Sequence, residues 1–163
     1  IAALCRDAIL QWPETRILMM SHVKELIEQN AEKMRAMWPG APLGIYSASL
    51  RKRNLEEPIT FAGIQSVRNK SKEIGHVDLV IIDECHLVNH KAEGGYRTLI
   101  EELTTINPEL RVIGLTATPH RLGHGLITDK PAIFDDLLES VTIEELIHKG
   151  YLANLRSKMV PRE

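Results

Sequence analysis

Residues 79–86 read Leu79-Val80-Ile81-Ile82-Asp83-Glu84-Cys85-His86, so four large apolar residues run straight into two carboxylates and a histidine. A continuous apolar run rich in β-branched residues is typical of a strand that is buried on both faces of a parallel sheet. Asp83 and Glu84 then fall at the carboxyl end of this strand, where open α/β sheets place their ligands. The stretch therefore predicts an α/β fold with a candidate site at one edge of its sheet.

The two adjacent acids suit phosphate chemistry. One carboxylate can hold Mg²⁺, usually through water, while the other orients or deprotonates an attacking water molecule. A strand that simply ends in a solvated acidic turn has the same pattern. Asp83 and Glu84 alone therefore leave both interpretations open.

Three further predicted strands also end in polar residues. They are residues 16–20, followed by Ser21-His22-Val23-Lys24; residues 59–66, which end in Gln65-Ser66; and residues 111–115, followed by Thr116-Ala117-Thr118-Pro119. Apolar residues at helical spacing follow the first of these strands, and Ser21 is the expected N-cap of that helix. The pattern alternates strand and helix, which predicts a parallel, doubly wound sheet.

With these four segments in this order, the chain resembles the first RecA-like domain of the superfamily 2 helicases, the DExH/DEAD-box group. Residues 83–86 resemble motif II, the Walker B box, and residues 116–118 resemble motif III. Residues 21–29 resemble motif Ia, and residues 60–66 resemble the following Ile-Gln-Ser motif. The resemblance implies a RecA-like P-loop NTPase fold, with a mostly parallel sheet and helices on both faces.

Within that group, the chain looks most like the bacterial RadD-type helicases. The similarity lies in His22-Val23-Lys24-Glu25-Leu26, in the Asp-Glu-Cys-His motif, in residues 114–119 and in the closing His148-Lys149-Gly150-Tyr151-Leu152. Type III restriction subunits and the repair helicase XPB look like looser relatives. Since RadD-type and restriction-type relatives act on DNA, the resemblance favours DNA over RNA as the partner.

The resemblance also implies roles for the motif residues in a Mg²⁺-dependent ATPase. Asp83 would hold Mg²⁺ through water, and Glu84 would polarise the water that attacks the γ-phosphate of ATP. His86 would couple this site to motif III and to the second domain, since an imidazole can bond a carboxylate on one side and a hydroxyl on the other. Motif III would carry the coupling through Thr116, Ala117 and Thr118.

Five residues are candidates for contacting a nucleic-acid backbone, because helix N-termini and short polar side chains bind phosphates without reading sequence. These residues are Ser21, His22, Lys24, Gln65 and Ser66. Lys24 could equally lie on a solvated helix face. Residues 51–53 (Arg-Lys-Arg) could extend a basic track, although a charged loop is usually just solvated, and Arg121 could face the cleft between domains or bulk solvent.

A zinc site is the alternative metal hypothesis for this region. It would use Cys85 with His86 and His90, or His120 with His124. The spacing matches no common zinc pattern, and Cys85 is expected to point into the fold. The sequence therefore favours Mg²⁺ and ATP over zinc.

The sequence contains no Gly-x-x-x-x-Gly-Lys-[Ser/Thr] motif, and the resemblance places that P-loop before motif Ia. Residues 1–12 have helical spacing and would be the helix after the P-loop. We therefore expect residues 1–153 to be a partial RecA-like domain and residues 154–163 to be a linker towards a second RecA-like domain.

This chain alone should neither bind ATP tightly nor hydrolyse it, and it could self-associate through the strand edge at residues 112–115. The alternative is a catalytically dead module of the same fold that binds nucleic acid or protein.

Composition bounds these expectations. The chain has 163 residues, 44% of them hydrophobic and 26% charged, as expected for one globular domain. Its net charge of −2 shows no excess of positive charge, which a dedicated nucleic-acid binder often has. A local basic groove would still be enough to bind nucleic acid.

No apolar run approaches the ~20 residues of a membrane span. Cys5 and Cys85 form no disulfide framework, and we expect a cytoplasmic protein without a membrane partner.

Four more local predictions follow from the sequence. Residues 43–47 should form a short strand and residues 51–54 a polar loop. Residues 96–106 should form an amphipathic helix that Asn107-Pro108 ends. A capping box at residues 142–145 should open a short helix that Gly150 closes.

Overall fold

The computed structural model describes residues 1–88, 94–121, 125–129, 133–138 and 141–153. Strands and helices alternate along most of this length. The elements are α1 (Ala2–Gln11), β1 (Ile17–Ser21), α2 (Lys24–Met37), β2 (Leu43–Ser47), β3 (Lys52–Arg53), β4 (Ile59–Gly63), α3 (Ile64–Val67), α4 (Ser71–Ile74), β5 (Leu79–Asp83), a 3₁₀ turn (Cys85–Leu87), α5 (Gly95–Ile106), β6 (Arg111–Leu115), β7 (His120–Arg121), β8 (Gly125–Leu126) and α6 (Ile143–His148). The predicted tail at residues 154–163 lies outside the described residues.

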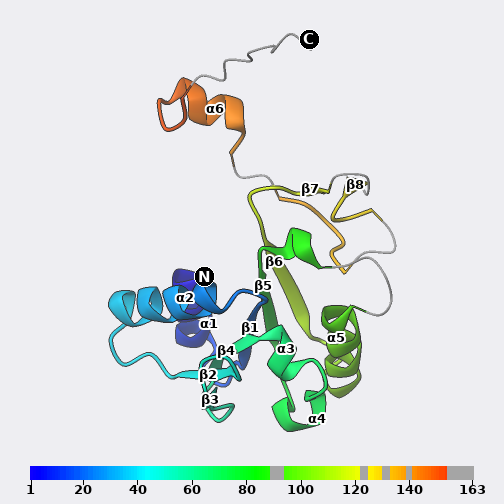
Figure 1. Ribbon diagram of the computed structural model, residues 1–163. Helices are drawn as coiled ribbons and strands as arrows, with labels where there is room; N and C mark the ends of the chain where they lie inside the picture. Colours follow the sequence, from blue (N-terminus) through cyan, green and yellow to red (C-terminus); the bar gives the residue numbers. More distant parts are fainter. Residues whose placement is uncertain (89–93, 122–124, 130–132, 139–140, 154–163) are drawn as a thin grey trace, which may run out of the picture.

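The six-stranded sheet has the order β3-β2-β4-β1-β5-β6, and all neighbours pair in parallel except β3, which is antiparallel to β2. In the centre of the sheet, Met19 pairs with both Phe61 and Ile81, and Ile81 pairs with Ile113. Because β1, β2, β4, β5 and β6 run in one direction, their carboxyl ends share one edge of the sheet (Figure 1). The structure thus confirms the mostly parallel α/β sheet.

Alternate residues of β1 enter two separate apolar cores, one on each face of the sheet. Leu18 and Met20 belong to the core with α3, α4 and α5, whereas Ile17 and Met19 belong to the core with α1 and α2. Figure 1 shows α1 and α2 on one side of the sheet and α3, α4 and α5 on the other. Burying each Ile, Leu or Met side chain contributes about 1.5–3 kcal/mol. The prediction of helices on both faces is therefore confirmed.

The two longest helices present apolar stripes to these cores. Ile27, Ala31 and Met34 of α2 are buried at three- and four-residue spacing, as are Tyr96, Leu99, Ile100 and Leu103 of α5. In the described part of the chain, no helix has the length and apolarity that crossing a membrane requires. These helices therefore cover the sheet by the amphipathic pattern that their sequences predict.

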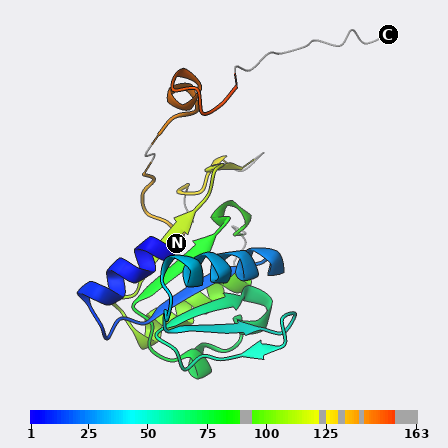
Figure 2. The ribbon, with the colours of Figure 1, turned by 90° about the vertical axis from the view of Figure 1, so that its left-hand side faces the viewer.

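The predicted ends of two helices are confirmed. Helix α5 ends at Ile106, and the buried Asn107 side chain donates a hydrogen bond to the Val77 carbonyl at 2.8 Å. At α6, the Thr142 hydroxyl accepts from the Glu145 backbone N–H at 3.1 Å, and Gly150 follows the helix with φ of 75°. Figures 1 and 2 both show α6 standing away from the sheet.

The predicted N-cap at Ser21 is wrong. Ser21 is the last residue of β1, where it pairs with Gly63, and Val23 precedes the first turn of α2. The Ser21 hydroxyl accepts a long 3.3 Å hydrogen bond from the Val23 backbone N–H. Parallel pairing with β4 keeps Ser21 extended and fully buried, so the helix begins three residues later, at Lys24.

Two other local predictions are wrong. The strand predicted for residues 59–66 ends at Gly63, and Gln65 and Ser66 lie on the helical turn α3, because Ile64 and Val67, three residues apart, are both buried. The predicted loop at residues 51–54 contains strand β3, which pairs with the end of β2. By contrast, the strand predicted at residues 43–47 is confirmed as β2.

Among the described residues, β6 lies at one edge of the sheet, with β5 beside it. The side chains of residues 112–115 are only half buried. An exposed strand edge can pair with another chain. Self-association through this edge remains a prediction.

Gly114 of β6 provides a test of the packing beneath this edge. A Cβ atom there would lie 2.6 Å from the Phe134 ring and 2.7 Å from the Cys85 sulfur, and both of these side chains are buried. We expect Gly114→Ala to lower the free energy of unfolding by about 1–3 kcal/mol, measured by urea denaturation, because neither neighbour can move without disturbing the core.

Gly63→Ala is the matched control, since a Cβ there meets its nearest atoms at 3.5 Å, an ordinary contact distance. Its free energy of unfolding should stay within about 0.5 kcal/mol of the wild-type value or rise slightly. Equal stabilities for the two variants would contradict the close packing around Gly114.

Candidate functional site

The candidate site is built at the carboxyl ends of β5 and β6. Asp83 is the last residue of β5 and pairs with Leu115 at the end of β6. Glu84 follows in the left-handed region, with φ of 52° and ψ of 49°, and the 3₁₀ turn begins at Cys85. This backbone conformation costs a non-glycine residue about 1–2 kcal/mol. The tight turn leaves the Asp83 and Glu84 side chains half exposed at the sheet edge, while Cys85 is fully buried.

Both carboxylate oxygens of Asp83 accept hydrogen bonds. The Asn30 side-chain amide on α2 donates to Oδ2 at 2.8 Å, and the Glu84 backbone N–H donates to Oδ1 at 3.2 Å. The buried Tyr96 lies near enough for the Asp83 charge to raise its phenol pKa, although burial is the larger cause of that rise. The carboxylate is thus oriented by a partner on another element.

His86 joins the two strand ends. Its Nδ1 atom lies 2.8 Å from the Thr116 hydroxyl, just after β6, and 3.3 Å from the Glu84 carboxylate. We expected a carboxylate on one side of the ring and a hydroxyl on the other, and this is wrong, because the same ring nitrogen faces both. The short turn after β5 folds His86 back towards β6, which brings both groups to the same side of the imidazole.

The structure brings only part of the predicted motif III into this cluster. The Thr116 hydroxyl contacts His86 and also accepts from the Thr118 backbone N–H at 3.1 Å. Ala117 and the Thr118 side chain are exposed. Thr116 is therefore the motif III residue that connects β6 to His86.

A second group of polar residues lies at the ends of β1, β2 and β4. Ser21 pairs with Gly63, and a Cβ atom on Gly63 would lie 3.5 Å from the Ser47 hydroxyl and 3.7 Å from the Ser66 hydroxyl. The Ser66 hydroxyl also accepts from the Ala48 backbone N–H at 2.9 Å. The structure thus gathers Ser21 and Ser66 around Gly63, although Ser21 itself is fully buried.

The other candidate nucleic-acid residues are exposed on the same edge or next to it. His22 lies between β1 and α2, Lys24 is the first residue of α2, and Gln65 lies on α3. The side chains of Lys52 and Arg53 on β3 are also exposed. The structure does not describe the Arg121 side chain, so its predicted place in a cleft stays untested.

The acidic pair suits Mg²⁺ better than zinc. Magnesium in nucleotide sites is held by one or two carboxylates together with substrate phosphates and water, and the half-exposed Asp83 offers such a carboxylate. Within the described residues, no three His, Cys, Asp or Glu side chains come together as a metal cage. His90 and His124 of the zinc hypothesis lie outside those residues, and Cys85 is fully buried.

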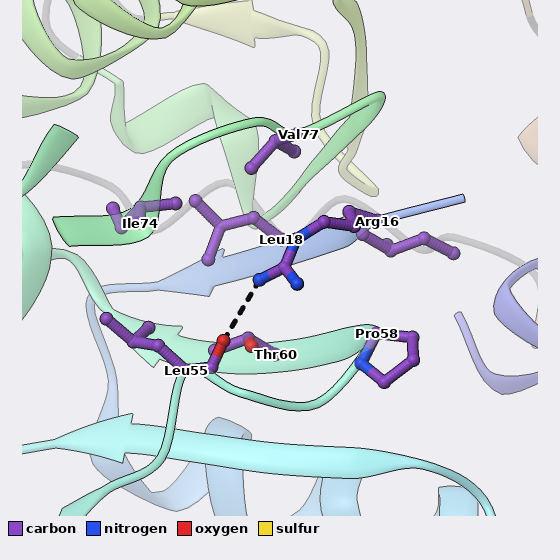
Figure 3. A pocket seen from close by; sticks show the side chains of 8 residues that line it. Arg16, Leu18, Leu55, Pro58, Thr60, Ile74 and Val77 are labelled. Atoms are coloured by element: carbon purple, nitrogen blue, oxygen red, sulfur yellow. Dashed lines mark hydrogen bonds between the residues drawn. The ribbon is translucent and has the colours of Figure 1, made fainter. Parts of the chain in front are cut away.

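A small cavity lies at the opposite edge of the sheet, around the amino ends of β1 and β4 (Figure 3). Its volume of about 10 Å³ is no more than one water molecule needs. Arg16 borders it and donates to the Leu55 carbonyl at 3.0 Å. The cavity is therefore separate from the site at the carboxyl edge.

Sequence reasoning missed three polar residues that the structure places beside the predicted ones. Asn30 contacts Asp83, and the hydroxyl of Ser47, which ends β2, lies 2.9 Å from that of Ser49 in the turn that follows. Ser47 ends a predicted strand, as the other candidates do, so the rule that found Ser21 could have found it. Asn30 lies in the middle of a helix, where no local pattern marks a residue that reaches a strand 53 positions away.

The likeness to known proteins agrees with this geometry. The crystal structure of the UvsW helicase from bacteriophage T4 superposes with a TM-score of 0.57 at 19% sequence identity, over 72% of this chain and 42% of that one. The chain thus spans less than half the length of that helicase. A search of curated proteins found no match. The sequence model for the type III restriction enzyme res subunit matches residues 1–121. The chain therefore belongs to the family of type III restriction enzyme res subunits and has the RecA-like fold of a superfamily 2 helicase domain.

Proposed function

We propose that this chain is the ATP-side domain of a nucleic-acid-dependent ATPase, a helicase or translocase that acts on DNA. One observation carries the proposal. Asp83 ends the parallel strand β5, Glu84 follows it, and His86 links Glu84 to Thr116 just after the neighbouring strand β6. Membership in a helicase family supports the general class of activity. The preference for DNA rests on the similarity of the motifs to RadD-type and restriction-type proteins.

Asp83 and Glu84 would have different roles in ATP hydrolysis. Glu84 would take a proton from the water whose oxygen attacks the γ-phosphorus, and ADP would leave with the electrons of the broken P–O bond. Asp83 would hold Mg²⁺, which, when bound, neutralises charge on the β- and γ-phosphates. The open turn at Glu84 suits the role of base because the Glu84 side chain is 39% exposed at the edge of the sheet.

His86 and Thr116 would transmit changes in the charge or position of Glu84 to the rest of the enzyme. A change in the charge or position of Glu84 alters its 3.3 Å contact with His86, and the same nitrogen holds Thr116. Thr116 in turn accepts from the Thr118 backbone, on the segment that leaves the sheet. A second RecA-like domain of the same protein would respond to movement of that segment.

The nucleic-acid strand would run across the ends of β1, β2 and β4. Ser66, Gln65, His22 and Lys24 are accessible there, and backbone N–H groups at turns can bind phosphates along with them. The buried Ser21 would act by shaping the turn before α2 rather than by touching the strand. The ATP cluster and this track share one edge of the sheet, which gives the two sites a common scaffold.

A second candidate function has the same fold. On that proposal the fold is a catalytically dead module that binds nucleic acid or protein. The first proposal instead needs a gene product that supplies a P-loop, whose backbone N–H groups and lysine grip the phosphates. The 163-residue chain alone would then be inactive.

Replacing Glu84 tests the proposed base. In the gene product with its P-loop, Glu84→Gln should lower ATP turnover by about 10²–10⁴-fold, because glutamine cannot accept the proton. Binding of ATP, measured by calorimetry, should persist, because the side chain keeps its shape. Glu109→Gln is the control, since Glu109 lies just before β6 at the opposite edge and is 85% exposed.

Unchanged turnover of Glu84→Gln would remove Glu84 from the mechanism. A wild-type protein that binds nucleic acid but hydrolyses no ATP would instead favour the binding module.

The strained backbone at Glu84 gives a prediction that does not depend on ATP. Glu84→Gly should raise the free energy of unfolding of this chain by about 1 kcal/mol, because glycine adopts positive φ without a steric penalty. Arg51→Gly is the matched comparison, with φ of 53° in the turn before β3 and outside the cluster of Asp83, Glu84 and His86. Urea denaturation of both variants should show similar gains. A loss of stability in Glu84→Gly alone would show that the left-handed backbone conformation of Glu84 does not destabilise the folded chain.

A further inference from the structure

Asn30 is a polar residue of α2 that the proposed mechanism has not yet used. Its side-chain amide donates to Asp83 Oδ2 at 2.8 Å, the short distance typical of a hydrogen bond to a charged acceptor. The bond joins the middle of α2 to the end of β5, across 53 positions of sequence. It is therefore a tertiary contact that packing must maintain.

The packing of α2 explains how Asn30 reaches Asp83. Ile27, Ala31 and Met34 are buried against the face of the sheet that α1 also covers. Asn30 lies three residues after Ile27 and four before Met34, at the border of this buried stripe, and is half exposed. The anchored stripe thus fixes the height and rotation of the amide relative to the end of β5.

An amide suits the support of a carboxylate that must also bind a cation. It fixes the carboxylate by donating to one oxygen, and it brings no positive charge that would compete with the metal. On the Asp83 oxygens, the lone pairs that accept no hydrogen bond remain available for metal-bound water. A lysine or arginine in the same place would neutralise the very charge that attracts Mg²⁺.

We infer that Asn30 is a positioning residue, which holds the Asp83 carboxylate in the orientation that binds the magnesium–nucleotide complex. The inference rests on the proposed ATPase function. Partners that orient metal-binding carboxylates typically contribute 10- to 100-fold to metal affinity. Loss of the Asn30 amide should therefore weaken the response to Mg²⁺ more than it weakens the fold.

The first experiment measures Mg²⁺ dependence without turnover. In the full-length gene product, Mg²⁺ is titrated into protein with fluorescent ADP, and nucleotide binding is followed by fluorescence. Asn30→Ala and Asn30→Leu should each raise the half-saturating Mg²⁺ concentration by about 10–100-fold. Gln29→Ala is the matched control, since Gln29 is the exposed neighbour on the same helix, and its value should be unchanged. In ATPase assays, saturating Mg²⁺ should restore most of the turnover of the Asn30 variants.

The second experiment uses the 163-residue chain and tests the hydrogen bond itself. A double-mutant cycle of Asn30→Ala and Asp83→Ala, measured by urea denaturation, should give a coupling of about tenfold in the unfolding equilibrium constant. Alanine is a strong helix former, so both Asn30→Ala and the control Gln29→Ala should fold. No coupling between the two substitutions would overturn the inference.

The outcomes also separate this inference from the function on which it rests. If Asp83→Ala abolishes the Mg²⁺ response but both Asn30 variants titrate like the wild type, the proposed function stands and the positioning role fails. If Asp83→Ala leaves the Mg²⁺ response unchanged, the proposed ATP site fails and the role of Asn30 fails with it.

Discussion

The parallel ladder of β1, β5 and β6 is the constraint on which the rest of the structure depends. Residue by residue, Met19 faces Ile81 and Ile81 faces Ile113, so the three strands end at one edge. A parallel sheet buries both faces, and here alternate side chains of β1 enter the cores beneath α1–α2 and α3–α5. A one-residue shift in this register would move Asp83 away from the end of β6 and turn each side chain of the shifted strand into the opposite core.

The polar chemistry at that edge is held by contacts from outside β5. Asn30 on α2 orients Asp83, and Thr116 after β6 holds His86, which faces Glu84. Glu84 itself takes a left-handed backbone conformation that its neighbours must stabilise. Strain of this kind gathers at functional sites when the surrounding structure over-determines it. The packed cores therefore contribute to the site as well as to the stability of the domain.

Much of the fold could be predicted because its signals are local. The apolar run at residues 79–82, the helical spacing at residues 96–106 and the capping Thr142 each predict an element that the structure contains. The errors arose where tertiary pairing overrides local preference. Ser21 is a favourable N-cap residue, but pairing with Gly63 keeps it in the sheet.

The candidate site was predictable to a similar extent. Residues that follow directly on strands, such as Asp83 and Thr116, were found because parallel strands end together. The shared nitrogen of His86 depends on the geometry of a three-residue turn, and Asn30 depends on the packing of a whole helix. Neither leaves a mark in the local sequence. A rule based on strand ends finds the groups at a site but not the residues that orient them.

We propose that ATP hydrolysis at Asp83 and Glu84 is coupled to a nucleic acid bound along the same sheet edge. The most direct test is ATP turnover by the gene product that contains the P-loop and second domain, compared without nucleic acid and with single-stranded DNA, duplex DNA or RNA. We expect low basal turnover that DNA stimulates and RNA does not. Turnover that ignores every nucleic acid, or no turnover at all, would contradict it.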